Sequence, residues 1–124
     1  MIRPLALLAL ASCAAPADAS ERRASASDRF DGTWTVVILT EAGTCDRATR
    51  YPVRIEGGQA RIVGTPVAIE GRVTADGAVA GSISNGLATA RILGRLARRG
   101  VGRGTWIATG ALDCRGRWTA ERRG

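Results

Sequence analysis

The side chains that could do chemistry in this chain are three cysteines, eighteen arginines and eleven carboxylates, because the sequence contains no histidine and no lysine. Without histidine, serine triads, cysteine–histidine pairs and histidine-based zinc or haem sites are excluded. Without lysine, Schiff-base catalysis and the phosphate-binding lysine of a nucleotide site are excluded too. The carboxylates are scattered over expected turns and strand ends, so no pair occupies the two unlike environments that acid–base catalysis needs. The sequence therefore predicts a protein that is not an enzyme and that carries no cofactor or metal.

Cys13 follows a short apolar run, residues 5–11, which itself follows a single positive charge at Arg3. This pattern is typical of a secretory signal, and the run is far shorter than the roughly 20 residues that span a bilayer. The segment Leu10-Ala11-Ser12-Cys13 is similar to the lipobox of bacterial lipoproteins, in which the cysteine becomes the lipidated first residue. That interpretation gives a signal peptide over residues 1–12 and a lipid anchor on Cys13.

Ordinary signal cleavage is the alternative for the same segment. Ala15-Pro16-Ala17 and Ala17-Asp18-Ala19 both fit the small-residue rule, which would place the signal peptide over residues 1–19. Residues 13–29 contain no hydrophobic period, so we expect them to form a flexible tether to a single domain over residues 30–124. Both alternatives predict an exported protein, either in the periplasm or anchored at the outer membrane, or alternatively extracellular.

Cys45 and Cys114 are the two cysteines that remain in the domain. Exported compartments oxidise thiols, so an even pair is expected to form a disulfide. Closing a loop of about 70 residues would stabilise the fold by about 4 kcal/mol in the chain-entropy model. The alternative is a pair of free, buried thiols.

Arg95, Arg98, Arg99 and Arg103 concentrate positive charge around a glycine-containing turn. Guanidinium groups suit phosphates, sulfates and carboxylates, and an exported protein meets lipopolysaccharide, anionic lipid or acidic polysaccharide before it meets nucleic acid. A dinucleotide site is excluded because Gly104 leads into an expected strand instead of a helix. These arginines are thus a candidate site for an anionic surface component. The alternative is a solvated hairpin without a ligand.

The elements that must position these residues are short strands. From Phe30 onward, apolar and polar residues alternate, and Gly57-Gly58, Asp76-Gly77 and Asn85-Gly86 supply tight hairpin turns. This predicts an all-β domain, a small antiparallel meander of about eight strands that forms a barrel or a barrel-like sandwich. The stretch 87–99 could alternatively form a helix with Leu93 and Leu96 on one face. The expected strands cover residues 33–41, 50–56, 59–64, 67–74, 78–84, 87–96, 102–109 and 114–121.

Small and branched residues alternate with polar ones in the middle strands, which predicts a narrow, filled interior. The residues expected to point inward are Val67, Ile69, Gly71, Val73, Val79, Gly81, Ile83, Ala88, Ala90, Ile92, Gly94 and Leu96.

All three tryptophans occur in one local pattern, a Gly-x-Trp at the start of an expected strand. The copies are Gly32-Thr33-Trp34, Gly104-Thr105-Trp106 and Gly116-Arg117-Trp118. The glycine would let the backbone enter the sheet without steric conflict, and the indole would fill the core. Stacking of a carbohydrate on the indoles is the functional alternative.

Two resemblances follow from these patterns. A Gly-x-Trp on the first strand, with Arg122 or Arg123 just after the last strand, resembles the calycin barrels of the lipocalin and avidin superfamily, which implies that an arginine stacks on Trp34. A longer resemblance is to short exported alphaproteobacterial proteins described as exoproteins of haem utilisation or adhesion. It implies residence in the envelope or outside the cell, and it transfers no activity. It rests on Phe30 to Trp34, Cys45-Asp46, Arg50 to Glu56, Gly104 to Trp106 and Cys114 to Arg122.

Few residues of this chain could serve as an axial ligand to haem iron. With no histidine, and with Met1 removed with the signal, the axial ligand would be Tyr51 or an unpaired cysteine. Tyr51 precedes a proline at a strand start and is interpreted as a core or rim aromatic.

The leading hypothesis is a non-catalytic exported envelope domain that binds an anionic surface component, with the membrane reached only through the lipid anchor. One alternative is a periplasmic hydrolase inhibitor that acts on a protein target through an exposed loop. Another is a carrier barrel for haem or lipid, which requires an apolar cavity of about 300 Å³ or more. Nucleic acid is not an expected partner, and the sequence does not indicate an oligomeric state.

Overall fold

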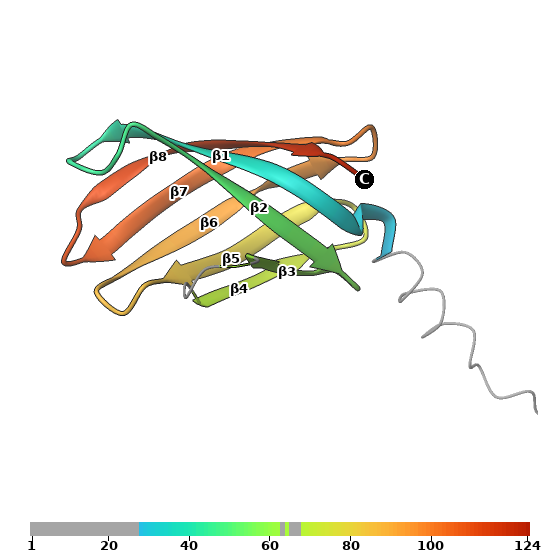
Figure 1. The fold of residues 1–124 in the computed structure, drawn as a ribbon, viewed down its shortest axis with the longest axis horizontal. Helices are drawn as coiled ribbons and strands as arrows, with labels where there is room; N and C mark the ends of the chain where they lie inside the picture. The colour runs from blue at the N-terminus through green and yellow to red at the C-terminus, as the bar shows by residue number, and fades with distance from the viewer. Residues whose placement is uncertain (1–27, 63, 65–67) are drawn as a thin grey trace, which may run out of the picture.

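The computed structural model describes residues 28–62, 64 and 68–124. The predicted signal peptide, the lipid anchor at Cys13, most of the tether and Val67 lie outside these residues. The described part confirms the predicted antiparallel meander, which closes into a barrel instead of dividing into a sandwich (Figure 1). A short 3₁₀ helix, η1 (Asp28–Phe30), precedes the strands β1 (Gly32–Ala42), β2 (Ala48–Glu56), β3 (Gln59–Ile62), β4 (Ala68–Val73), β5 (Ala78–Ser84), β6 (Ala88–Ala97), β7 (Val101–Gly110) and β8 (Cys114–Arg122).

Each strand pairs with the next one along the chain, and β1 pairs with β8 to close the barrel. The predicted turn glycines Gly57, Gly58, Gly77 and Gly86 all have positive φ, as tight hairpins require. Strand β3 covers Gln59–Ile62, and the next residue of the predicted strand, Val63, lies outside the described residues. Local pairing by hairpins therefore accounts for seven of the eight strand contacts, and only the β1–β8 seam joins distant parts of the sequence.

The ambiguous stretch 87–99 contains strand β6 and no helix. Its burial alternates along the strand, so that Leu93 is exposed and Leu96 is buried. A helix would have placed these two leucines on one face, whereas a period of two separates them. The other side chains predicted to face inward line the barrel cavities, namely Ile69, Gly71, Val73, Val79, Gly81, Ile83, Ala88, Ala90 and Ile92.

Two of the Gly-x-Trp copies form an interlocking pattern across strands β7 and β8. Trp118 is the register partner of Gly104, and Trp106 is the register partner of Gly116. A Cβ atom at Gly104 would overlap the Trp118 indole, and one at Gly116 would overlap the carbonyl oxygen of Leu39. These glycines therefore give room for close approach inside the sheet, which differs from the predicted role at strand entry.

The tryptophans are buried, with exposed fractions of 1% for Trp34, 5% for Trp106 and 4% for Trp118. Each indole N–H donates to a backbone carbonyl, at 2.8 Å for Trp34 to Phe30 and 3.1 Å for Trp106 to Leu39 and for Trp118 to Leu93. A buried indole whose donor is satisfied belongs to the core and offers no face for a carbohydrate.

Helix η1 plugs one end of the barrel. Phe30 is 1% exposed, and the Arg122 guanidinium carbon lies 4.8 Å from the centre of the Trp34 ring. Nη2 of Arg122 also donates to the carbonyl oxygen of Arg29 at 2.8 Å. The stacking implied by the calycin resemblance is thus present as a contact, and it joins η1, β1 and β8 at the plugged end.

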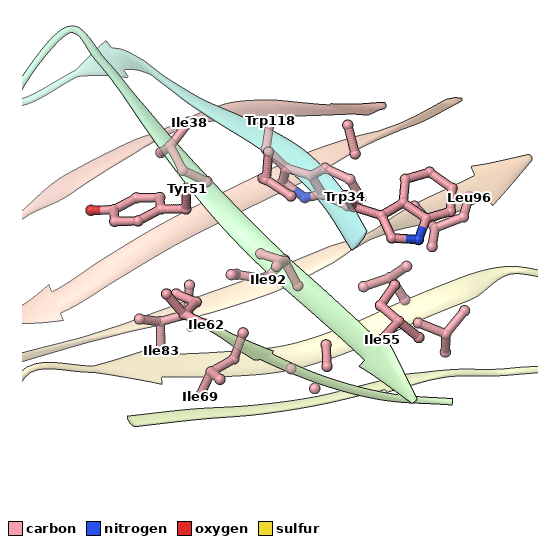
Figure 2. A pocket seen from close by; sticks show the side chains of 18 of the residues that line it. Trp34, Ile38, Tyr51, Ile55, Ile62, Ile69, Ile83, Ile92, Leu96 and Trp118 are labelled. Carbon is pink, nitrogen blue, oxygen red and sulfur yellow. The ribbon is translucent and has the colours of Figure 1, made fainter. Parts of the chain in front are cut away.

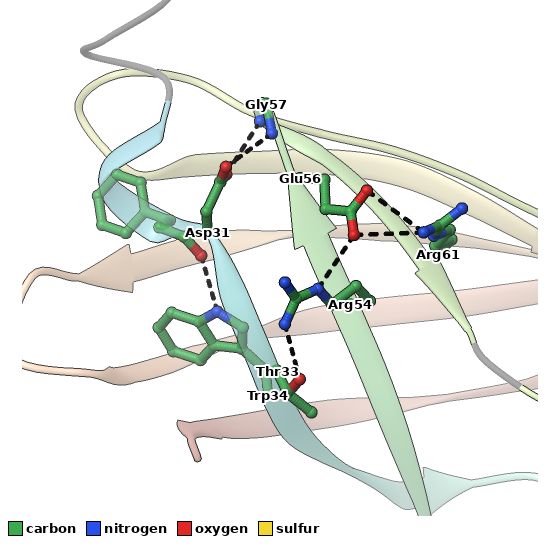
Figure 3. Close-up of polar contacts among 9 residues, drawn as sticks. Asp31, Thr33, Trp34, Arg54, Glu56, Gly57 and Arg61 are labelled. Atoms are coloured by element: carbon green, nitrogen blue, oxygen red, sulfur yellow. Dashed lines mark hydrogen bonds and ion pairs between the residues drawn. The ribbon is translucent and has the colours of Figure 1, made fainter. Parts of the chain in front are cut away.

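Polar contacts hold the neighbouring β2–β3 turn to the plugged end (Figure 3). The Asp31 carboxylate accepts the backbone N–H of Gly57 at 2.9 Å. Arg54 donates to the Thr33 hydroxyl at 3.1 Å, and Glu56 forms ion pairs with Arg54 and Arg61. The start of β1 is therefore fixed to β2 by side chains as well as by backbone pairing.

The predicted disulfide between Cys45 and Cys114 is confirmed. It joins the β1–β2 loop to the first residue of β8, and Cys114 is 2% exposed. The bond therefore secures the β1–β8 seam at the end opposite to the plug, which we call the mouth.

Candidate functional site

The predicted arginine cluster lies at the β6–β7 hairpin. Arg95 and Arg103 are register partners on the outer face of these strands, and Arg98 and Arg99 occupy the turn between them. All four side chains are exposed. The hairpin therefore brings the four predicted residues to one end of the barrel, next to the plug.

These arginines line an open depression of about 990 Å³, which we call the arginine groove. Two further arginines, which were not predicted, also line the groove: Arg50 from β2, and Arg123, which follows β8. Arg50 reaches the groove because Arg103 pairs with Thr119, Thr119 with Val37 and Val37 with Arg50 in successive strands. The remaining lining residues are Phe30, Thr35, Val37, Asp76, Leu96, Ala97, Val101, Gly102, Thr119, Ala120 and Glu121.

The two carboxylates of the groove each pair with an arginine. Asp76 lies 3.5 Å from Nη1 of Arg95, and Glu121 lies 3.2 Å from Nη2 of Arg123. A hydrogen bond from the Thr74 hydroxyl is the main cause that lowers the pKa of Asp76 below its usual value. Asp76 is therefore charged at neutral pH and offsets Arg95.

Four groove arginines have no ion pair within the described residues. They are Arg50, Arg98, Arg99 and Arg103, and each is exposed. Guanidinium groups present forked N–H donors that match phosphate, sulfate and carboxylate oxygens. The groove therefore offers an uncompensated positive surface to a ligand with several anionic groups.

The barrel interior is narrow, as predicted. A cavity of about 70 Å³ lies between Trp34 and Leu96 at the plugged end and Ile38 and Ile83 toward the mouth (Figure 2). Its lining is apolar apart from Tyr51 and Ser82. This space holds no more than a very small apolar molecule.

A second cavity, of about 470 Å³, lies at the mouth and shares Ile38, Tyr51, Ile83 and Ile92 with the inner one. Trp106 and small inward residues add apolar wall, and the strand ends and loops add a polar rim. The mouth cavity is thus larger than the narrow interior led us to expect. The further lining residues are Thr40, Thr44, Cys45, Asp46, Thr49, Asn85, Ala88, Ala90, Ala108 and Leu112.

Tyr51 lies where the two cavities meet. Its side chain is half-buried, and its hydroxyl points away from the Trp34 end (Figure 2). The polar rim is partly engaged already, since Asn85 accepts the backbone N–H groups of Leu87 and Ala88 and Thr40 donates to the Asp46 carbonyl. The mouth therefore combines an apolar floor, one phenol and a preorganised rim.

Within residues 28–62, 64 and 68–124, no three or more Cys, Asp or Glu side chains are grouped to hold a metal ion. No helix in that part of the chain is both long enough and apolar enough to cross a membrane. Comparison of the sequence with protein-family models and with curated proteins, and of the fold with solved structures, gives no significant match.

Proposed function

We propose that this protein is a non-enzymatic, exported binding domain that holds an anionic component of the cell envelope in the arginine groove. The observation that carries the proposal is the group Arg50, Arg98, Arg99 and Arg103, exposed and without an ion pair in the described structure. Surface charges that serve only solubility are commonly interspersed with the opposite sign. Here two groove carboxylates are engaged by two other arginines, which leaves four positive charges for a partner.

The chemistry of the groove favours repeated phosphate, sulfate or carboxylate groups over nucleic acid. Binding of single-stranded nucleic acid combines positive charge with aromatic side chains on which bases stack. The aromatic residue of the groove is Phe30, which is buried in the plug, and the three tryptophans are buried as well. The groove therefore supports recognition of anionic groups by charge and hydrogen bonding alone.

Reversing three groove charges should abolish most of this binding. We expect Arg98→Glu/Arg99→Glu/Arg103→Glu to weaken binding of heparin, used as a soluble polyanion, by about 100-fold, because each arginine near an anionic surface contributes about 1 kcal/mol. Titration calorimetry at low salt measures this, since salt screens exposed charges. All three residues are exposed, so the fold should be retained.

The matched control reverses three exposed arginines elsewhere, Arg47→Glu/Arg61→Glu/Arg72→Glu. It lowers the net charge of the chain by the same amount as the groove variant. We expect its loss of binding free energy to be no more than half of the loss in the groove variant. Equal losses in the two variants would show that net charge, and no groove, attracts the polyanion.

The mouth cavity supports a second candidate function, the binding of a small ligand with an apolar body and a polar end. Its volume of about 470 Å³ lies within the range of about 300–1,000 Å³ that is usual for small-molecule sites. The apolar floor would take the body of the ligand, and Tyr51 and the rim would contact its polar end. This assignment is independent of the arginine groove, which lies beside the plug at the other end.

Filling the mouth tests this candidate. We expect the neutral fluorescent probe N-phenyl-1-naphthylamine to bind the wild-type protein, and Ala90→Phe to weaken its binding at least about tenfold by occupying the cavity. Ala80→Phe is the matched control, because Ala80 is exposed on the outer face of β5 whereas Ala90 lines the mouth. Fluorescence titration that gives the same affinity for both variants would contradict a mouth site.

A further inference from the structure

We propose that the outer face of β6, β7 and β8 docks directly on an anionic lipid bilayer, with Leu93 and Ile107 entering the boundary between headgroups and acyl chains. This inference rests on the proposed function and narrows the anionic component to a phospholipid surface. We call this surface, from Arg91 to Arg117 across the three strands, the docking face. It continues from the arginine groove toward the mouth, since Arg95 and Arg103 border both.

The docking face exposes apolar side chains that the core does not use. Leu93 is 52% exposed and Ile107 is 55% exposed, while the adjacent inward positions Gly94 and Trp106 complete the interior. Leu87 and Leu112, at the two ends of the same hairpin, are 75% and 39% exposed. In the described part of the chain, all large exposed hydrophobic side chains thus belong to residues 87–112. Apolar residues gathered on one face indicate an interaction surface.

The strand register sets arginines around these apolar side chains. Ile107 pairs with Arg91 on β6 and with Arg115 on β8. Leu93 pairs with Thr105, whose partner on β8 is Arg117. Strands β6, β7 and β8 lie next to one another along one side of the barrel (Figure 1). The face therefore presents apolar tips within a layer of guanidinium groups.

The charged side chains of the hairpin are all positive, which favours an anionic partner. Residues 87–112 contain five arginines and no aspartate or glutamate. A second copy of this face would bring arginines together, and a soluble polyanion would leave Leu93 and Ile107 in water. An anionic bilayer satisfies both features, because its phosphates meet the arginines and its acyl boundary accepts the apolar side chains.

The experiment compares Leu93→Ser/Ile107→Ser with the wild-type protein on three probes. The first probe is vesicles of phosphatidylcholine with about 30% phosphatidylglycerol, which approximates the charge of an anionic leaflet. The other two probes are vesicles of phosphatidylcholine alone and heparin. Both substituted side chains point outward, so the barrel is expected to fold normally. We expect the variant to bind anionic vesicles about tenfold more weakly and to bind heparin unchanged.

An introduced tryptophan reports the contact directly. Because the native indoles are buried, Leu93→Trp adds an exposed one, and its emission should shift to the blue on anionic vesicles. Ala80→Trp, exposed on β5, is the matched control and should not shift.

The outcomes separate the two proposals. If the serine variant and the wild type bind anionic vesicles equally, or if the Leu93→Trp and Ala80→Trp variants respond alike, the docking face makes no apolar contact and the inference is wrong. Equal wild-type binding to neutral and anionic vesicles would overturn it as well. In each of these cases the proposed function stands as long as heparin binding depends on Arg98, Arg99 and Arg103, and it fails on its own if that dependence is absent.

Discussion

Replacing Cys45 and Cys114 together by alanine is expected to lower the free energy of unfolding by about 4 kcal/mol. The bond spans 69 positions in the sequence and encloses six whole strands, β2 to β7. Reduction or removal frees this long loop in the unfolded chain, whose entropy then rises. Since domains are stable by only about 5–15 kcal/mol, the loss is a large share of the total.

Denaturant unfolding of three samples measures this effect: the oxidised wild type, the reduced wild type and the alanine double variant. The reduced wild type and the double variant should unfold at similar, lower denaturant concentrations. An oxidised protein that unfolds together with the reduced one would contradict the proposed role of the bond at the seam.

Trp34→Ala should cost about 3–5 kcal/mol of unfolding free energy, the usual cost of removing a fully buried aromatic side chain. Trp34 is 1% exposed, donates to the Phe30 carbonyl and carries the Arg122 guanidinium on its ring. Its removal opens the plug and leaves Phe30 and Arg122 without their common partner. Thermal unfolding followed by circular dichroism gives the change.

A double-mutant cycle with Arg122→Met isolates the stacking contribution. We expect a coupling energy of about 1–2 kcal/mol between Trp34 and Arg122, because the guanidinium is partly removed from water. Arg123→Met is the matched control, since Arg123 is exposed and pairs with Glu121. A coupling between Trp34 and Arg123 as large as that with Arg122 would show that the stacked geometry contributes nothing specific.

Much of the barrel follows from local sequence signals. Strand β5 (Ala78–Ser84) has the predicted bounds, because Asp76-Gly77 and Asn85-Gly86 mark both of its turns. The alternation of small and polar residues also predicted which side chains face inward. Such signals are local because a hairpin needs only a turn and two strands of period two.

The candidate sites depend on information that is not local. Arg50 joins Arg98 and Arg103 only through the registers of β1, β7 and β8, which no single stretch of sequence specifies. The mouth cavity depends on which end of the barrel η1 plugs. The role of Gly104 was missed for the same reason, since its need for space arises from Trp118 on the next strand.

The β1–β8 seam can form only late during synthesis, because its two strands lie far apart in the sequence. Of the eight described strands, β1 is synthesised before the others, yet one of its two partners is β8, which is synthesised after the other seven. Until residues 114–122 are present, β1 and β7 both have unpaired edges that can recruit strands from other chains. A chain that stops before Cys114 would lack both the closing strand and the thiol that reacts with Cys45. A chain without β8 is therefore expected to form an aggregation-prone open sheet, and the barrel can close only once β8 is present.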